Sequence, residues 1–562
     1  MSLLTDLPGE DLSPPILASD QVVIVRGGRT YLGDANLTWP GSAAASVTQP
    51  DTGAVARSVT GKVLETLSVW DFWVAPATDA TAMLRLFAAA GRSGIIPAGD
   101  YVVSGQIDWP SLGQVIRGEG RTKTRILINS PPAGAQAIFN VLAGEPSTQF
   151  EDIGFYFAQP DTNVRANLNV YPPAIQYNAA PRGRVSRIRT QRGTRGVVLV
   201  GNCGGFTSQG HESSCFVTNM EMDGCLDSVR IQAPHFWPFG LTTNQQQIFY
   251  DDSCYGVHSG RCDDLKISDG IVFAGRAFRF YRSASGSTFG TITGQDFDNF
   301  GGLFVEAGNI VVSGFVTTLG NTSKRHITQS GGVLTLAAPY IRTDAVPLNG
   351  SCISLTGGHL NLAGGTIDSR NADSRALLVQ GSAATFDVVG TSILLDPARD
   401  YSSAQIYIAD CAGGTVAGVS ATPPTTGSGS FAAVAADRAV VFNGNRHSGR
   451  GIDIGGNYLL PLFLDNYSGG TRDFIGSFGS GPVRRKRFTG TADASGNYSV
   501  AHGIANADQR LLGVQAYCKS ASGTAQPITL TSVTDTTATF SGAVASSPVR
   551  ILISYSDELH AW

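Results

Sequence analysis

Short apolar runs, separated by small polar residues, fill most of this chain. Between about residues 112 and 445, segments such as VSRIRTQRGTRGVVLVGN from Val185 and VTNMEMDGCLDSVRIQAP from Val217 share one alternation of apolar and polar positions. Each unit holds two or three strands of about three to five residues, and units recur roughly every 22 to 35 residues. A unit this small buries its apolar face only by stacking on its neighbours. The pattern predicts an all-β solenoid, a right-handed parallel β-helix, over 112–445.

The regions on either side have other patterns. Residues 1–65 are rich in Pro, Gly, Ser and Thr, and QVVIVRGGRTYLGD predicts one hairpin around Gly27-Gly28, so we expect a short N-terminal module there. Residues 66–111 are expected to form the start of the β-helix with a capping helix. Longer strands with a period of two predict a C-terminal antiparallel β-sandwich over 486–562, joined by a connector at 446–485.

The segment TDATAMLRLFAAAG predicts that capping helix. Thr78 or Asp79 can cap its first turn, because a side-chain oxygen there accepts a free backbone N–H. Met83, Phe87 and Ala90 fall on one face at helical spacing. Gly91 or Gly94 is expected to end the helix.

Composition narrows the classes of partner. The chain has 562 residues, a net charge of -4 and only 15% charged residues, so we expect no nucleic-acid partner. No apolar run approaches the roughly 18 residues of a membrane span, so we expect no membrane insertion. The eight cysteines show neither CxxC pairs nor zinc spacing, which predicts reduced, packed cysteines in a protein folded in a cytoplasm. We predict no metal and no cofactor.

The stretch SVWDFWVAPATDATAMLRLFAAAGRSGIIPAGDYVVSGQI, residues 68–107, resembles the opening motif of pectate-lyase-like β-helix proteins, particularly bacteriophage tailspikes. It departs from that motif by Trp73 in place of a glycine and by the loss of most of a Gly-Asp-Gly loop. The segment APHFWPFG, residues 233–240, is also similar to an aromatic segment of some tailspike β-helices. The motif residues shared with the family are Val69, Asp71, Phe72, Asp79, Pro97, Ala98, Gly99 and Tyr101.

The resemblance implies a phage tailspike that binds, and often depolymerises, a bacterial surface polysaccharide such as capsule, exopolysaccharide or O-antigen. It further implies a homotrimer whose N-terminal module attaches to phage tail or baseplate proteins. The C-terminal sandwich would then support trimerisation or bind glycan. Such a protein folds in the host cytoplasm and acts outside the cell, on the virion tail.

Outward side chains at matched positions of stacked coils form columns spaced by about 4.8 Å. Our alignment of the repeats places Arg189, Glu221 and Lys266 in one column. In the same alignment, the next columns hold Gln191, Asp223 and Ser268, then Val198, Arg230 and Arg279, then Val200, Gln232 and Tyr281. The surface expected to be continuous comprises Glu221, Asp223, Arg230, Arg279 and Tyr281.

The longest insertion, His235 to Asp264, lies in this region and is dense in aromatic, acidic and histidine residues. Lengthened loops in an economical scaffold often carry function. Aromatic side chains combine an apolar face with a polar edge, which suits a sugar ring. The predicted substrate-binding residues are Arg189, Arg230, His235, Trp237, Tyr255, Arg279 and Tyr281.

Endo-glycoside hydrolysis requires two carboxyl groups, about 5 Å apart for retention of configuration or about 6.5–9.5 Å for inversion. The predicted acid is the carboxyl in the more apolar surroundings, Asp251 or Asp252, which follow Phe249 and Tyr250. Glu221 or Asp223 would then serve as base or nucleophile. Asp227 is a further candidate carboxyl group.

Other interpretations stay open at this point. A polysaccharide lyase needs a base near the sugar C5 and cations that neutralise a uronate, and Arg189, Arg230, Lys266 and Arg279 can supply the charge. A receptor-binding spike without catalysis would need only the aromatic loop and the sandwich. At single positions, Asp223-Gly224 is also typical of a simple turn, and His235 and His258 are more often structural than catalytic.

Overall fold

A computed structural model gives the fold of the chain. The residues that it describes are 21–26, 29–34, 46–47, 57–58, 67–72, 78–296, 302–319, 326–345, 350–371, 373–399, 401, 403–422, 431–435, 440–447, 452–454, 462–464, 466–468, 471–473, 483–501, 511–519, 525–534, 537–543 and 546–556.

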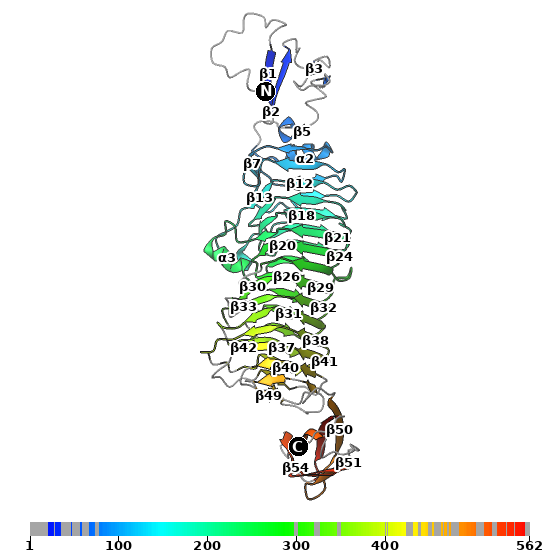
Figure 1. Ribbon diagram of the computed structural model, residues 1–562. Coiled ribbons are helices and arrows are strands. Elements are labelled where there is room, and N and C mark those ends of the chain that lie inside the picture. The colour runs from blue at the N-terminus through cyan, green and yellow to red at the C-terminus, as the bar shows by residue number, and fades with distance from the viewer. Residues whose placement is uncertain are drawn as a thin grey trace, which may run out of the picture.

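The central part is a parallel β-solenoid, as the repeats predict (Figure 1). Each coil contributes one strand to each of three sheets. In the first coil, β6 (Gly94–Ile96) belongs to sheet 1, β7 (Gly99–Val102) to sheet 2 and β8 (Ile107–Trp109) to sheet 3. The segment GIIPAGDYV therefore supplies two consecutive sides of one coil rather than a hairpin.

The strands of the three sheets, in chain order, are as follows. Sheet 1 contains β5 (Leu67–Ser68), β6, β9 (Val115–Gly118), β12 (Gln149–Glu151), β15 (Arg184–Ser186), β18 (Thr207–Gln209), β21 (Cys225–Gln232), β24 (Cys262–Ser268), β27 (Phe289–Thr293), β29 (Asn309–Ser313), β32 (Val333–Ala337), β35 (His359–Ala363), β38 (Thr385–Val389), β41 (Gly413–Ala417), β44 (Val440–Asn443) and β47 (Leu462–Leu464). Sheet 2 contains β7, β10 (Thr124–Ile128), β13 (Gly154–Phe157), β16 (Arg189–Gln191), β19 (Glu212–Ser214), β22 (His235–Phe236), β25 (Ile271–Val272), β30 (Val316–Leu319), β33 (Tyr340–Thr343), β36 (Thr366–Asp368), β39 (Ser392–Leu394), β42 (Ser420–Thr422), β45 (Arg446–His447), β48 (Asn466–Ser468) and β49 (Thr471–Asp473). Sheet 3 contains β8, β11 (Phe139–Val141), β14 (Ile175–Asn178), β17 (Arg195–Val200), β20 (Thr218–Asp223), β23 (Tyr255–Ser259), β26 (Arg276–Phe280), β28 (Leu303–Val305), β31 (Ile327–Gln329), β34 (Ser351–Leu355), β37 (Arg375–Gln380), β40 (Ile406–Asp410), β43 (Ala432–Val434) and β46 (Ile452–Ile454).

Sheet 2 forms one face of the solenoid, although in its middle the hydrogen-bonded ladder is reduced to single bridges. Between β25 and β30 it continues through single bridges of Asp296 to Ile271 and to Val316. β48 and β49 pair antiparallel at its far end, whereas the other described strand pairs of the three sheets run parallel.

One core runs along the inside of the solenoid. Its buried residues extend from Leu67 to Phe442, and inward positions such as Ile188, Met220 and Leu265 are at most 1% exposed. In the first coils the core is aromatic: Trp109 packs against Phe139 and against Phe150 at 5.2 Å between ring centroids. Inward and outward positions therefore follow the predicted alternation, because a period of two places successive side chains on opposite faces.

The predicted capping helix is α2 (Thr81–Ala89), which closes the first coil and packs on β8 (Figure 1). Phe87 packs edge-on against Trp109 at 5.9 Å between ring centroids. Gly94 is required by this close packing, since a Cβ there would lie 2.8 Å from the Phe87 ring and 2.3 Å from the carbonyl oxygen of Leu67.

The ends of α2 correct two details of the prediction. Ala80, not Thr78 or Asp79, is the N-cap residue, although the Asp79 carboxylate accepts the backbone N–H of Thr81 at 2.7 Å and so serves the first turn. Ala90 is exposed and follows the helix, so Ala88 fills the buried face instead. Gly91, at φ +62°, ends the helix as expected.

The outer parts also agree with the predicted classes. β1 (Gln21–Arg26) pairs antiparallel with β2 (Arg29–Asp34), which is the predicted hairpin. Trp73, where the sequence departs from the family motif, lies outside the described residues. Near the C-terminus, β50 (Val483–Thr491), β56 (Pro548–Ser556), β52 (Leu511–Lys519) and β53 (Ala525–Pro527) form one antiparallel sheet. A second sheet contains β51 (Tyr498–Ala501), β55 (Thr537–Ser541) and β54 (Thr529–Val533), and side chains of both sheets share one core. This shared core makes the unit a β-sandwich.

All eight cysteines are buried and form no disulfide bond, as the composition predicts. Within the described part of the chain, no helix has the length and apolar character needed to cross a membrane.

Candidate functional site

Two long connections build a ridge along the corner where sheet 2 turns into sheet 3. The first, residues 158–174, joins β13 to β14, and the second, residues 237–254, joins β22 to β23. The second carries α3 (Thr243–Phe249), which projects from the solenoid in Figure 1. We call these two connections together the ridge.

The helix α3 begins at a capping box. The Thr242 hydroxyl accepts the Gln245 N–H at 3.2 Å, and the Gln245 side chain accepts the Thr242 N–H, also at 3.2 Å. This helix was not predicted from the sequence, although Thr-x-x-Gln before Ile248 and Phe249 is the pattern of a capping box.

The two connections brace one another. Arg165 of the first donates hydrogen bonds to the carbonyl oxygens of Phe216, at 2.6 Å, and Ile248, at 3.0 Å. The Thr242 hydroxyl donates to Asp161 at 2.5 Å. The ridge also has a core of its own, formed by Phe216, Leu241, Ile248, Phe249, Cys254 and Ala274. The predicted insertion is therefore a folded element whose partner, residues 158–174, the sequence analysis did not identify.

On the sheet 3 side of the ridge, one column contains Glu221, His258 and Arg279, which are register partners on β20, β23 and β26. The His258 ring is stacked between two tyrosines, 4.7 Å from Tyr255 and 4.5 Å from Tyr281. Tyr255 and His258 both lie on β23, and Tyr281 directly follows β26, the next strand of sheet 3. We call Glu221, Asp223, Tyr255, His258, Arg279 and Tyr281 the sheet 3 cluster.

Arg279 joins the aromatic and acidic parts of the sheet 3 cluster. Its guanidinium donates to Glu306 at 2.8 and 3.1 Å and to the Tyr255 hydroxyl at 3.3 Å. It also lies 5.4 Å from the ring centroids of both Tyr255 and Tyr281. The hydrogen bond with Glu306 raises the pKa of Arg279, so this group stays a cation.

His258 is held in its neutral form. Its Nε2 lies 3.4 Å from Nη1 of Arg279, and because a guanidinium only donates, Nε2 accepts and the proton resides on Nδ1. Burial and the adjacent Arg279 lower the pKa of His258 to about 4. The imidazole therefore supports Arg279 as an acceptor over the neutral pH range.

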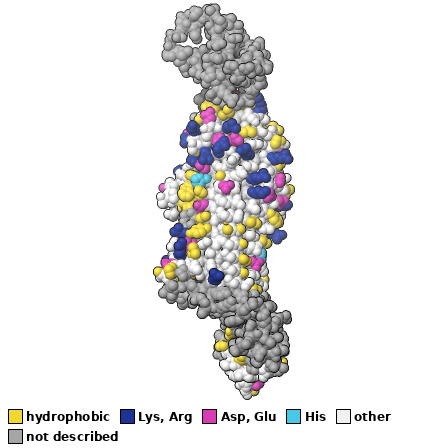
Figure 2. Space-filling model, viewed as in Figure 1, with side chains coloured by type: hydrophobic (Ala, Val, Ile, Leu, Met, Phe, Trp, Pro, Cys, Tyr) yellow, Lys and Arg dark blue, Asp and Glu magenta, His cyan; other side chains and the backbone are white. Residues whose placement is uncertain are grey.

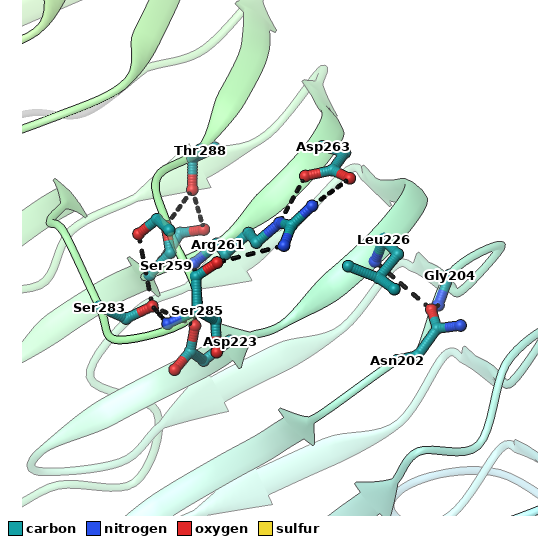
Figure 3. A network of polar contacts seen from close by, with 12 residues as sticks. Asn202, Gly204, Asp223, Leu226, Ser259, Arg261, Asp263, Ser283, Ser285 and Thr288 are labelled. Atoms are coloured by element: carbon teal, nitrogen blue, oxygen red, sulfur yellow. Dashed lines mark hydrogen bonds and ion pairs between the residues drawn. The ribbon is translucent and has the colours of Figure 1, made fainter.

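Glu221 and Asp223 lie two residues apart on the outer face of β20, yet their environments differ. Burial raises the pKa of Glu221, while Arg195, 3.6 Å away, lowers it and Asp223 raises it. Asp223 instead accepts the backbone N–H of Arg261 at 3.0 Å and the Ser283 hydroxyl at 2.6 Å (Figure 3). One carboxyl group is thus desolvated and the other is anchored by two donors.

Asp251 and Asp252 do not have the apolar surroundings that the sequence analysis expected. Their side chains are 45% and 44% exposed, and they lie 3.7 Å from Arg165 and 3.9 Å from Arg276, respectively. These positions follow from the end of α3, which turns both residues away from Phe249, a buried residue of the ridge core. Arg276 lies 5.8 Å from the Tyr255 ring centroid, so Asp252 borders the sheet 3 cluster.

On the sheet 2 side of the ridge, Arg189, Glu212 and His235 form another column, on β16, β19 and β22. Trp237 is 39% exposed and packs against Phe273 at 4.5 Å between ring centroids. Phe239 lies beside His235 at 4.7 Å and under the Arg189 guanidinium at 5.1 Å. We call Arg121, Arg189, Glu212, His235, Trp237 and Phe239 the sheet 2 cluster.

The predicted columns were wrong in one respect. Arg189, Glu221 and Lys266 do not stack, because they lie on sheets 2, 3 and 1. Arg230 pairs with Thr207 and Lys266 on sheet 1, so it is not part of the surface that was predicted to contain it together with Glu221 and Arg279. Three further residues of the predicted columns also lie outside sheet 3, namely Gln191, Gln232 and Ser268. Three strands of one coil share the same alternation, so matching patterns fixes which side chains face outward but not which sheet they occupy.

The predicted residues thus separate into groups. Glu221, Asp223, Tyr255, Arg279 and Tyr281 come together on sheet 3, whereas Arg189, His235 and Trp237 come together on sheet 2. Asp227 is exposed on β21 of sheet 1, and its carboxylate accepts the N–H of Ser228 at 2.7 Å. The sequence analysis missed Arg195, Arg261, Ser283 and Glu306, because their proximity depends on the register between coils of unequal length.

Among the residues that the structure describes, no group of three or more His, Cys, Asp and Glu side chains has a geometry suited to a metal ion. The sheet 3 cluster offers arginine, tyrosine and carboxyl groups, a set that can bind a sugar, move a proton and bind an anionic substituent.

No known protein family and no curated protein matches this chain. Among solved structures, it is similar to a mutant tailspike protein of E. coli bacteriophage HK620 in complex with a pentasaccharide, with a TM-score of 0.48, 12% identity, and coverage of 92% of this chain and 98% of the other. It is similar to the Pseudomonas phage phi297 tailspike, with a TM-score of 0.40, 12% identity, and coverage of 88% and 99%. The catalytic unit of a GH87 alpha-1,3-glucanase from Streptomyces thermodiastaticus has a TM-score of 0.35, 14% identity, and coverage of 74% and 69%. At these identities and TM-scores, the similarities place no functional residue in this chain.

Proposed function

We propose that this protein is a tailspike-like depolymerase that binds a bacterial surface polysaccharide and cleaves it by endo-glycoside hydrolysis at the sheet 3 cluster. The observation that carries the proposal is the pair Glu221 and Asp223, two outward carboxyl groups in opposite environments. Pairs of carboxyl groups whose environments separate their protonation are how one site supplies both an acid and a base.

In this proposal Glu221 is the general acid. Burial raises the pKa of Glu221, which keeps a proton available for the departing glycosidic oxygen. Asp223 is the base, because the Arg261 N–H and the Ser283 hydroxyl fix its carboxylate and leave one oxygen for a water molecule. The roles therefore differ from the expected assignment of Asp251 or Asp252 as the acid, and we assign those two aspartates to the margin of the site.

The spacing on the strand favours inversion of configuration. The Cα atoms of residues i and i+2 on a strand lie about 6.7 Å apart and their side chains point to the same side, so we propose a carboxyl separation of that order for Glu221 and Asp223. Carboxyl groups about 6.5–9.5 Å apart leave room for a water molecule between the base and the sugar. Tyr255, His258 and Tyr281 lie beside this pair and offer stacked ring edges for the neighbouring sugar units.

A lyase is the second candidate, and Arg279 is the observation that favours it. Its guanidinium contacts the Tyr255 hydroxyl at 3.3 Å, so a cation that can neutralise a uronate lies next to a possible base. In that reaction the base removes the C5 proton, the bond between C4 and the glycosidic oxygen breaks, and that oxygen takes up a proton, which leaves a C4–C5 double bond in the sugar and consumes no water.

The test is incubation of the purified protein with purified capsular and O-antigen polysaccharides, followed by product analysis. Hydrolysis gives new reducing ends alone, whereas a lyase also gives the ultraviolet absorbance of an unsaturated uronate. Binding without shortening would reject both enzymatic proposals and leave a receptor-binding protein. We further propose that the chain acts as a homotrimer on the virion tail, attached through residues 1–65; size-exclusion chromatography with light scattering tests the trimer.

A further inference from the structure

The sheet 2 cluster has features that the reaction on sheet 3 does not use. The Glu212 side chain is only 10% exposed and accepts hydrogen bonds from Arg121, at 2.5 Å, and from Arg189, at 2.7 Å. Two guanidinium groups thus share one carboxylate. Since burial lowers the pKa of His235, the imidazole adds no charge at neutral pH, and the group keeps one excess positive charge.

The aromatic part of this cluster is rigid and faces solvent. Trp237 continues the sheet ladder, because its N–H donates to the carbonyl oxygen of Ser213 at 3.0 Å. Its ring packs on Phe273, so one face is supported from below while the side chain stays 39% exposed. The following turn is fixed as well, since Arg192 donates to the carbonyl oxygen of Gly240 at 2.9 Å and Ser214 donates to that of Phe239 at 3.1 Å.

The sheet 2 cluster and the proposed catalytic pair lie on different sheets, and Trp237 and Phe239 of the cluster stand at the start of the ridge's second connection. β22 carries His235 into the connection 237–254 on the sheet 2 side, and β23 leaves that connection with Tyr255 on the sheet 3 side. The intervening residues fold into α3 and pack on residues 158–174. Glu221 and Asp223 therefore lie on sheet 3, whereas Trp237 follows a strand of sheet 2, so the two clusters occupy different sheets.

From these observations we infer that the sheet 2 cluster is a second, non-catalytic glycan-binding site, in which a pyranose ring stacks on Trp237 and an acidic substituent of that sugar lies near Arg189 and Arg121. The inference rests on the proposed function, because the glycan is the same surface polysaccharide. An exposed aromatic face binds the C–H side of a pyranose, and the excess positive charge favours a carboxylate over a neutral sugar. This second site retains the polymer between cleavage events.

The experiment uses an array of purified bacterial capsular and O-antigen polysaccharides, both acidic and neutral. Trp237→Ala is compared with Trp237→Phe, which keeps an aromatic ring, and with Phe289→Ala, which removes another exposed aromatic side chain, 54% exposed on sheet 1. Binding is measured in a Glu221→Gln/Asp223→Asn background, so the polymer stays intact. We expect Trp237→Ala to weaken binding to an acidic polymer about tenfold, while Phe289→Ala has no effect and Trp237→Phe retains most of the affinity.

A second measurement separates this inference from the proposed function. With wild-type Glu221 and Asp223, Trp237→Ala should slow shortening of the polymer but leave unchanged the cleavage of an oligosaccharide substrate too short to bind beyond the sheet 3 cluster. Equal effects of Trp237→Ala and Phe289→Ala on the polymer, or binding of neutral polymers alone, would overturn the inference while hydrolysis stands. Binding that depends on Trp237 without any shortening would support the second site and reject the hydrolase. An array on which wild type binds nothing rejects both.

Discussion

The two halves of the solenoid have the same fold but differ in coil length and in the side chains on their outer surfaces. In the half that contains β21 and β24, the register partners Arg230 and Lys266 lie 36 residues apart, whereas Asn361 and Asp387 in the other half lie 26 apart. Figure 2 shows charged side chains crowding the upper half of the visible face and becoming sparser below. One outward column of sheet 1 reads Arg117, Glu151, Ser186, Gln209 and Gln232 in the first half and Ser313, Ala337, Ala363, Val389 and Ala417 in the second.

Both halves bury an unbroken core, so the charged groups and insertions of the first half are not required for the solenoid to form. The second half shows what the fold needs by itself: inward apolar side chains, with no long insertion between the described strands of sheets 2 and 3. What the first half adds, namely the ridge and the clusters on either side of it, is therefore the part to which function is assigned. The following substitutions compare residues of the first half with residues of the second.

The largest difference is expected for the two carboxyl groups. Glu221→Gln or Asp223→Asn should lower the rate of polysaccharide cleavage about 10²–10⁴-fold, because each removes a proton-transfer group. Asp387→Asn, at an exposed carboxylate of the second half, should leave the rate unchanged. Reducing-end assays at matched protein concentration measure this. Equal rates for Glu221→Gln and wild type would move the chemistry away from β20.

A core substitution in the second half should have the opposite profile. Leu360 is fully buried between Leu334 and Phe386, and Leu360→Ala should lower the free energy of unfolding by about 2–5 kcal/mol through the cavity it leaves. Cleavage per folded molecule should not change. Denaturant unfolding measures the first effect, and Asn361→Ala, on the outer face of the same strand, should stay within about 0.5 kcal/mol of wild type.

His258→Phe should have a moderate effect on substrate binding. The phenyl ring keeps the stacking between Tyr255 and Tyr281 but removes the acceptor for Arg279, a hydrogen bond worth about 1–1.5 kcal/mol. We expect KM to rise about tenfold with kcat little changed. Tyr407→Phe, which keeps the ring beneath Arg375, is the counterpart and should change neither. A loss of kcat beyond about a hundredfold would instead give His258 a direct part in the chemistry.

The smallest expected effect is a displaced pH profile. Arg195 lowers the pKa of Glu221, so Arg195→Gln should raise that pKa further, and Glu221 should keep its proton to higher pH. The alkaline limb of kcat/KM then moves toward higher pH. Arg375 occupies the equivalent position at the start of β37, and Arg375→Gln should leave the profile in place. A shift of the limb toward lower pH would contradict the assignment of Glu221 as the acid.

The contrast between the halves also explains what the sequence predicted and what it did not. The alternation around Ile188, Met220 and Leu265 predicted three inward side chains correctly, because burial is a local property of a strand. Their outward neighbours Arg189, Glu221 and Lys266 proved to lie on three different sheets. Membership of a sheet depends on the full length of each coil, and coil lengths vary most in the half that carries the clusters.

Residues brought together through tertiary contacts were the hardest to predict. Ser283 and Arg261 reach Asp223 from positions 60 and 38 residues away, and neither stands in a recognisable motif. The aromatic insertion was identified from composition, yet its helix depends on the capping box at Thr242, which the composition does not reveal. The apolar setting expected for Asp251 failed because Arg165, from another coil, lies beside it.

The mutual bracing of the ridge limits how its specificity can be altered. Because Arg165 of one connection binds the carbonyl oxygen of Ile248 in the other, transplanting residues 237–254 alone onto a related solenoid would leave that carbonyl oxygen without its donor and the buried face of Ile248 without Phe216. The two connections therefore depend on each other for their packing, although more than sixty residues of regular coil separate them in the chain. Recombination that exchanges substrate preference must therefore carry whole coils, from β13 to β23, rather than one loop.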